Sequence, residues 1–340
     1  MRFAGLTTSL SIEALIKMAR QAQKETLLSS LNHLIEANSL ALGDKLAALK
    51  PPSKEVKSLV HLYRNSFVEK FIDRTEVTPL LVKSNSRNLS QLQARHSGVV
   101  DALTEVMTTQ SFDQGDALPF HAEDILQEQI CLGLLIQHAA QLADLKTPSE
   151  FGVVRIDESM EELCSFARMQ AIALANHNMT VSCPPIEMRG LDKIPKLTCV
   201  PSVVEFAILE CLKNAVYSSI KKVESGNNKD QTPPSVVISV IDTKTHLVVE
   251  ILDEGIGMDC STCESALRFD LSSARSTKGL VDDNRSYQPM SAPLQGFGVG
   301  CVLAKLHLLA VNAGSIHLTS PGPGLGAAAV LRLRKPTVEP

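Results

Sequence analysis

The chain has 340 residues, of which 44% are hydrophobic, and this is enough for about two domains with sizeable cores. Its formal net charge of -4 gives no general attraction to nucleic acid, so a nucleic-acid partner is not expected. No apolar run approaches the roughly 20 residues that a membrane-spanning helix needs, and no membrane span is expected.

The eight cysteines are scattered along the chain, and several lie inside apolar helical or strand patterns. This placement is typical of buried free thiols in a reducing compartment and not of a disulfide framework. Cys260 and Cys263 form a C-x-x-C pair, but a zinc site needs about four ligands and no second pair lies nearby. We therefore expect neither a zinc site nor a redox site at this pair.

Residues 11–145 carry one helical pattern after another. Apolar residues recur at helical spacing near residues 15–35, 56–71, 89–106 and 122–145. Pro51-Pro52-Ser53 separates the first two stretches and supplies an N-cap. Long helices with short connections favour a bundle, so residues 1–145 are predicted to form a four-helix-type bundle domain. The first nine residues fit either the remnant of a transit peptide or an ordinary chain start.

The period of the apolar pattern changes after Lys146-Thr147-Pro148-Ser149, which is the predicted domain boundary. The second domain, residues 150–336, is predicted to contain helices and a mixed sheet in an α/β sandwich, so the fold class is α + α/β. Helices are expected at 157–176, 201–223 and 297–312, and strands at 180–182, 196–199, 236–241, 247–252, 315–319 and 327–333. The strands at 236–241 and 247–252 are expected to form a hairpin.

The helix predicted at 201–223 carries Glu210, Lys213 and Asn214. Glu210 and Asn214 are four residues apart, so they share one face. An asparagine oxygen can hold a hard cation beside a phosphate, and a glutamate one turn earlier can accept a proton or orient a hydroxyl group. Taken alone, the pair is better explained as two solvated residues on an amphipathic helix. The face that packs is expected to hold Val204, Ile208, Leu212 and Val216.

A second motif, Asp253-Glu254-Gly255-Ile256-Gly257, directly follows a predicted buried strand. An aspartate there can accept a hydrogen bond from the amino group of adenine. Gly255 and Gly257 would let the backbone approach the base closely. Taken alone, this D-x-G-x-G pattern is better explained as a simple turn after a strand.

A third motif, Gly296-Phe297-Gly298-Val299-Gly300, precedes a predicted helix. Its backbone amides and the helix N-terminus would form a site for anions. It is not a P-loop, because no Gly-Lys-Ser/Thr follows, and it does not follow a strand as a dinucleotide fingerprint does. The preceding irregular stretch, about 258–295, is too long for an idle connection and is predicted to be a mobile lid. Gly322-Pro323-Gly324-Leu325-Gly326 is interpreted as a hairpin loop.

The order of these features is more informative than any one of them. A helix with Glu and Asn is followed by a strand with D-x-G-x-G, a lid, a glycine loop, a helix, a strand, a glycine turn and a last strand. This order resembles the Bergerat-type ATP-binding fold shared by gyrase B, the heat-shock chaperones, histidine kinases and the MutL mismatch-repair proteins.

From about residue 8 to 335, the chain resembles the mitochondrial protein kinases of 2-oxo acid dehydrogenase complexes, which include the pyruvate dehydrogenase kinases and the branched-chain 2-oxo acid dehydrogenase kinases. Two segments of each half carry the resemblance: Leu59–Phe67, Arg95-His96-Ser97-Gly98-Val99-Val100, Val200–Ala215 and Pro293–Gly300.

This resemblance implies an ATP-dependent serine/threonine kinase that phosphorylates and inactivates the E1α subunit of such a complex. Glu210 would be the catalytic base and Asn214 would hold Mg²⁺. ATP would be bound by Asn214, Asp253, Gly255, Gly257, Gly296, Phe297, Gly298, Val299 and Gly300. The helical domain would dock the lipoyl-bearing E2 core, and the protein would be a homodimer in the mitochondrial matrix. The cofactors implied are ATP and Mg²⁺, with K⁺ as a further cation.

The chain also departs from the family pattern. Phe206 stands where pyruvate dehydrogenase kinases often have a histidine, Ile256 replaces a glycine, and Ala327 replaces a threonine near adenine. Gln129 and Gly133 stand in place of two arginines, which weakens the expectation that His96 belongs to an allosteric anion pocket. Features shared with the branched-chain type favour it over the pyruvate type: the short segment after the last strand, Phe206, Phe166-Ala167-Arg168 and Leu331–Lys335.

Two other functions stay open. A histidine kinase would need a phosphoacceptor histidine followed by acidic and arginine residues, and neither His96 nor His138 has that sequence around it. A non-catalytic ATP-binding regulatory module is compatible with Phe206 and Ala327. The presence of both Glu210 and Asn214 argues against it.

Overall fold

The computed structural model of the chain describes residues 10–22, 27–47, 57, 60–63, 118–143, 151–179, 181–191, 194, 196–225, 232–268 and 299–336. The chain divides into two compact units. The first comprises Met1–Arg155, Ala310–Asn312 and Val338–Pro340, and the second comprises Ile156–Leu309 and Ala313–Thr337. The boundary predicted at 146–149 lies outside the described residues.

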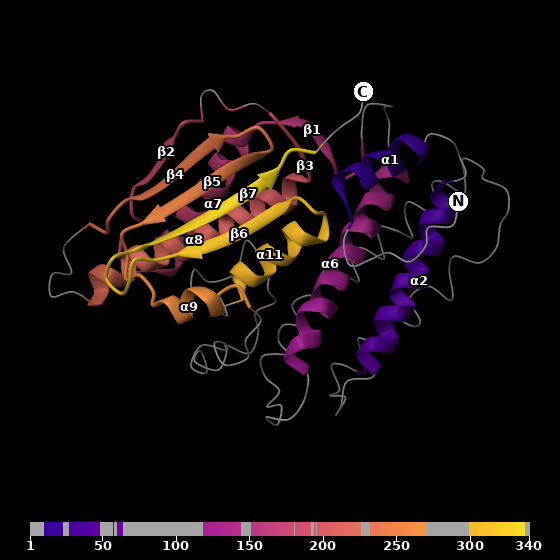
Figure 1. Cartoon of the computed structure of the whole chain (residues 1–340), viewed down its shortest axis with the longest axis horizontal. Coiled ribbons are helices and arrows are strands. Elements are labelled where there is room, and N and C mark those ends of the chain that lie inside the picture. The colour runs from indigo at the N-terminus through magenta and orange to yellow at the C-terminus, as the bar shows by residue number, and fades with distance from the viewer. Residues whose placement is uncertain are drawn as a thin grey trace. The chain divides into compact units, whose positions relative to one another are not determined.

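Three helices of the N-terminal unit pack against one another (Figure 1). They are α1 (Ile12–Ala22), α2 (Leu27–Ala47) and α6 (Leu118–Ala143). Their positions confirm the helical patterns predicted there. The helix predicted at 89–106 lies outside the described residues, so a bundle of four helices stays a prediction.

A chain of buried polar residues joins α2 and α6 through Tyr63. The Tyr63 hydroxyl group donates to Oε1 of Gln129, and Oγ of Ser39 donates to the Tyr63 carbonyl at 3.1 Å. All three residues are buried. Gln129 therefore serves as a neutral hydrogen-bonding residue at a position where the resembled family has an arginine. His96 lies outside the described residues.

His138 is buried in α6 beside a tight turn. Its Nδ1 accepts a hydrogen bond from the Val153 amide at 3.4 Å. Gly152 has φ +62°, and a Cβ atom there would lie 2.4 Å from the same nitrogen, so both the backbone and the ring require glycine. Burial lowers the pKa of His138 to about 4, and an interaction with the backbone of Leu15 opposes part of this shift.

We expect His138 to make the protein sensitive to acid. Below pH ~6.5 the unfolded state binds a proton at this ring while the folded state does not, so stability falls as the pH falls toward the folded pKa of about 4. From pH 7 to pH 4, this residue should remove about 3 kcal/mol from the free energy of unfolding. Urea unfolding at both pH values measures the loss. His138→Gln should abolish it, whereas His317→Gln on an exposed strand position should not; an equal loss in all three proteins would contradict the assignment.

The C-terminal unit contains a five-stranded sheet in the order β2-β4-β5-β7-β6 (Figure 1). Its strands are β2 (Ile186–Arg189), β4 (Val236–Asp242), β5 (His246–Asp253), β6 (Gly314–Thr319) and β7 (Ala327–Arg334). The β2–β4 pair is parallel and the other three pairs are antiparallel. A separate two-stranded sheet joins β1 (Arg155–Glu158) to β3 (Leu197–Cys199).

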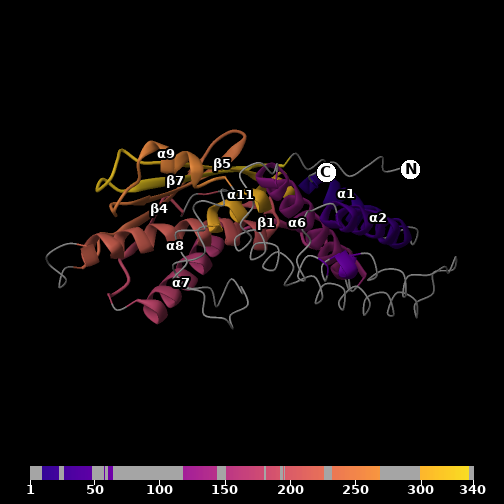
Figure 2. The same cartoon turned by 90° about the horizontal axis from the view of Figure 1, so that it is seen from below.

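The helices α7 (Met160–Asn178), α8 (Pro201–Ser225) and α11 (Gly300–Ala310) lie on one face of the five-stranded sheet (Figure 2). Alternate residues of the central strands are buried, because side chains of a strand point to opposite faces in turn. The packing face predicted for α8 is confirmed by fully buried side chains at Val204, Ile208, Leu212 and Val216. The unit is thus a mixed α and β structure with helices layered on a mixed sheet.

Two local predictions were wrong. Residues 181–182 are irregular, and the strand lies at Ile186–Arg189 instead. It begins after Pro184-Pro185, because proline cannot donate to a strand ladder. Within the stretch predicted as irregular, Cys260–Ser265 forms the short helix α9, and Asp259 caps it by accepting from the Thr262 amide at 2.7 Å. Residues 269–295 of the predicted lid lie outside the described part of the chain.

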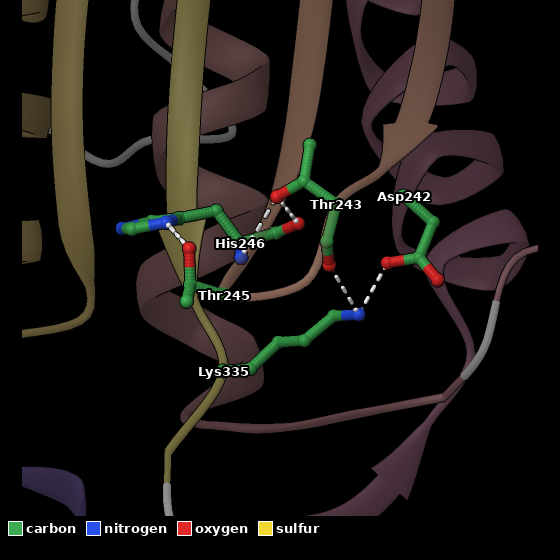
Figure 3. Close-up of polar contacts among 5 residues, drawn as sticks. All are labelled: Asp242, Thr243, Thr245, His246 and Lys335. Carbon is green, nitrogen blue, oxygen red and sulfur yellow. Dashed lines mark hydrogen bonds and ion pairs between the residues drawn. The ribbon is translucent and has the colours of Figure 1, made fainter.

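The predicted hairpin between β4 and β5 is confirmed, and Lys335 holds it to the end of β7 (Figure 3). Oγ1 of Thr243 donates to the His246 carbonyl at 2.7 Å and accepts from the His246 amide at 3.0 Å. Nζ of Lys335 pairs with Asp242 and donates to the Thr243 carbonyl at 2.8 Å. These contacts fix one end of β5 and β7, and Asp253 lies at the opposite end of β5.

Candidate functional site

The candidate site begins where β5 ends at Asp253. One carboxylate oxygen, Oδ1, accepts hydrogen bonds from Oγ of Ser218 at 3.0 Å and from the Gly255 amide at 2.8 Å. Burial raises the pKa of Asp253, while the hydrogen bonds from Gly255 and Ser218 oppose the shift. Ser218 was not predicted as a site residue. Its signal in the sequence is its spacing, because Glu210, Asn214 and Ser218 follow one another at intervals of four on α8.

The D-x-G-x-G loop packs closely against the glycine turn between β6 and β7. A Cβ atom on Gly326, which has φ +78°, would lie 2.0 Å from the Asp253 carbonyl oxygen. A Cβ atom on Gly257, which has φ +63°, would lie 2.2 Å from the Gly322 carbonyl oxygen. The two loops therefore approach each other more closely than any other residue type allows. The sequence interpretation treated the second loop as a simple hairpin, and its contact with Asp253 is a new feature of the site.

Two side chains hold this pair of loops in place. Oγ of Ser320 donates to the Gly326 carbonyl at 2.6 Å and accepts from the Met258 amide at 3.0 Å. Nζ of Lys222, on α8, donates to the carbonyl groups of Glu254 at 2.5 Å and Gly324 at 3.1 Å. The loops are thus fixed to each other and to α8.

Glu210 is buried, with an exposed fraction of 3%. Nζ of Lys213 lies 2.9 Å from Oε1 and 3.1 Å from Oε2 of its carboxylate. The interpretation of Glu210 as a solvated surface residue is therefore wrong. A Cβ atom on Gly300 would lie 2.1 Å from Oε2 of Glu210, so the start of α11 lies directly against this carboxylate. The structure brings together Glu210 and Gly300, which are far apart in the sequence.

Asn214 is exposed, one turn beyond Glu210 on α8. Its Nδ2 donates a hydrogen bond to Sγ of Cys301, the residue after Gly300, at 2.9 Å. Val299 is buried. The other predicted members of the glycine loop, Gly296, Phe297 and Gly298, lie outside the described residues.

The predicted site residues thus form two groups along α8. Glu210, Asn214 and Gly300 form one group, and Asp253 with Gly255 and Gly257 forms the other. Ser218 joins the second group to α8 and lies one turn from Asn214, about 6 Å along the helix axis. A Cβ atom on Gly255 would lie 2.1 Å from Oγ of Ser218, so this loop touches the helix itself.

These residues suit a nucleotide in two respects. The Asp253 carboxylate is a partly buried acceptor, which an amino group on a nucleotide base can use, and the two adjoining loops carry the exposed apolar side chains of Ile256 and Leu325. Among the residues that the structure describes, no three His, Cys, Asp or Glu side chains form a metal site. Mg²⁺ fits this donor set nevertheless, because it is commonly bound by one or two protein oxygens together with phosphates and water. Asn214 can supply such an oxygen.

The positions that depart from the resembled family have identifiable contacts. The Phe206 ring lies against the His307 ring of α11, with 4.7 Å between the ring centroids. Ala327 pairs with Asp253 in the β5–β7 register, so the missing threonine hydroxyl group would have been beside this carboxylate. Ile256 is exposed on the same loop.

No helix in the described part of the chain is long and apolar enough to cross a membrane. Comparison of the chain with models of protein families and with curated protein sequences finds no match.

Proposed function

We propose that the C-terminal unit is a Bergerat-type ATP-binding domain and that the chain is a protein serine/threonine kinase. One observation carries the proposal: α8 brings Glu210, Asn214 and the Ser218 partner of Asp253 into line, with Gly300 against Glu210 and Gly255 against Ser218. The resemblance to the 2-oxo acid dehydrogenase kinases implies roles for Glu210, Asn214 and Asp253 in one site, and Ser218 is an addition from the structure.

Each residue has a definite task in this proposal. Asp253 accepts a hydrogen bond from the adenine amino group, and the glycines of both loops leave room for the base. Asn214 supplies an oxygen for Mg²⁺, and the start of α11 faces the phosphates. Glu210 accepts the proton of the substrate hydroxyl group as that group attacks the γ-phosphorus atom, and ADP leaves. Lys213 holds the Glu210 carboxylate in position.

The proposed substrate is a serine of the E1α subunit, and the branched-chain complex is favoured over the pyruvate complex on sequence resemblance. The proposed partners are E1α, the lipoyl-bearing E2 core and a second copy of the chain in the mitochondrial matrix. Docking of E2 would belong to the N-terminal unit.

A second candidate, a non-catalytic ATP-binding module, is favoured by the ion pair between Glu210 and Lys213. A carboxylate bound by a buried ammonium group is less available as a base than a free one. A histidine kinase that uses His138 is disfavoured, because this ring is fully buried.

Incubation with purified branched-chain and pyruvate complexes tests the proposal. The chain, Mg²⁺ and ATP should inactivate one complex and place acid-stable phosphate on its E1α subunit, with the branched-chain complex inactivated faster. ATP binding without transfer to either complex would favour the non-catalytic module. Acid-labile phosphate on the chain itself would identify a histidine kinase.

We expect Asn214→Ala to weaken magnesium-dependent ATP binding about tenfold or more, because an oxygen ligand of the cation is lost. Binding of ATP in the presence of EDTA should change little, since the contacts of Asp253 with the base remain. Calorimetric titration under both conditions measures the two dissociation constants. Equal weakening with and without Mg²⁺ would contradict the role of Asn214 as a metal ligand.

A further inference from the structure

The contact between Asn214 and Cys301 has a consequence for the proposed cation site. A side-chain amide has two ends of opposite polarity, and only the oxygen end can bind a cation. Asn214 is exposed, so close packing does not decide which end faces which way. The structure places Nδ2 toward α11, where it donates a hydrogen bond to Sγ of Cys301 at 2.9 Å.

We propose that Cys301 is a positioning residue for magnesium–ATP. Its sulfur accepts a hydrogen bond from Nδ2 of Asn214 and so leaves Oδ1 as the end of the amide that is available to the cation. The inference rests on the proposed function, because it assigns a role to Cys301 within the same site. Cys301 itself touches neither the cation nor the nucleotide in this role.

The position of Cys301 is itself fixed on two sides. It is buried, with an exposed fraction of 4%, and it follows Gly300, which lies against Glu210. On the other side it shares a hydrogen bond with Cys211, which is buried on α8. This hydrogen bond and burial raise the pKa of Cys211, so the Cys211 thiol stays neutral at pH 7.

A row of polar atoms therefore runs from Cys211 through Cys301 to Asn214. Cys211 and Asn214 are three residues apart, so they lie on neighbouring parts of the same face of α8. Cys301 closes this row from α11. An apolar residue at this position would pack in the same space, but it would have no acceptor for the asparagine amide.

Partners that orient a metal ligand without touching the metal typically contribute 10- to 100-fold to metal affinity, and sulfur is a weak acceptor. We therefore expect Cys301→Ala to raise the Mg²⁺ concentration for half-maximal ATP binding about tenfold. ATP binding in EDTA should stay within about twofold of the wild type, because Asp253 is not affected.

Three substitutions separate the loss of the acceptor from a change in volume. Cys301→Ala is smaller than cysteine and Cys301→Val is larger, and both lack an acceptor, so both should show the shift. Cys301→Ser keeps an acceptor and should restore Mg²⁺ dependence to near the wild-type value. Cys164→Ala is the matched control, since Cys164 is also a buried cysteine and lies on α7.

The experiment titrates MgCl₂ into the full chain with ATP and follows nucleotide binding by calorimetry. In an Asn214→Ala background, Cys301→Ala should produce no further shift, because the group that it positions is gone. A wild-type Mg²⁺ titration for both Cys301→Ala and Cys301→Val would overturn the inference while leaving the proposed function intact. Equal weakening in EDTA, or additive losses with Asn214→Ala, would show a structural role only and would also overturn it. A wild-type protein that binds no ATP would remove the proposed function itself and the inference with it.

Discussion

Glu210→Gln is expected to lower phosphoryl transfer to E1α by a factor of about 100 to 10,000, because an amide cannot accept the substrate proton. The ATP dissociation constant should change little. Asp253 and the glycine loops, which are proposed to hold adenine, lie on the other side of Asn214 along α8. Single-turnover transfer and equilibrium ATP binding, measured on the same preparation, separate the two effects.

Glutamine is the informative replacement because Glu210 forms a buried ion pair with Lys213. Glu210→Ala would leave an ammonium group buried without its partner, which typically costs about 3–5 kcal/mol of stability. A loss of activity in the alanine variant would then combine chemistry with unfolding. In the glutamine variant, the side-chain oxygen can still accept a hydrogen bond from Nζ of Lys213, so the ammonium group loses the charge of its partner but keeps an acceptor.

Glu205→Gln provides the matched control on the same helix, five residues earlier and outside the site. It should retain wild-type transfer and ATP binding. Transfer by Glu210→Gln at the wild-type rate would show that another group accepts the proton. The non-catalytic module predicts a different result, namely no transfer in the wild type and equal ATP binding in all three proteins.

The sequence predicted α7, α8, α11 and the strands β3 to β7 because their patterns are local, whereas β1 and α9 were not predicted. Apolar and polar residues alternate along 236–241 and 247–252, and α8 has an apolar face. Each of these patterns can be recognised from a few neighbouring residues. The strand at Ile186–Arg189 was predicted at the wrong residues because it is short, and four residues carry too little alternation to be recognised.

The contacts within the site could not be predicted in the same way. Ser218 reaches Asp253 across 35 residues, and Cys301 reaches Asn214 across 87. Serine and cysteine are common on helices, and the four-residue spacing of Ser218 from Asn214 indicates only that both lie on one face of α8, not which distant residue they contact. The sequence also gave no indication that Glu210 is buried, because the i, i+3 spacing of Glu210 and Lys213 fits an exposed ion pair equally well.

The close contact of the two loops leads to the second large expected effect. Gly326→Ala should weaken ATP binding at least tenfold and destabilise the C-terminal unit by about 3 kcal/mol, because two costs add. The left-handed backbone at φ +78° costs a side chain about 1–2 kcal/mol. The new Cβ atom would also lie 2.0 Å from the Asp253 carbonyl oxygen, so the D-x-G-x-G loop must move.

Gly324→Ala, in the same turn, distinguishes these two costs. Gly324 has φ +81°, but no atom lies within 4 Å of an added Cβ atom, so this variant pays the backbone cost without the collision. We expect it to lose about 1–2 kcal/mol of stability and to keep ATP affinity within about threefold of the wild type. Thermal unfolding and ATP titration of both variants measure the difference. Equal ATP affinities of the Gly326→Ala and Gly324→Ala variants would show that nucleotide binding does not depend on the position of Asp253 relative to this turn. The proposed adenine pocket would then have to lie elsewhere.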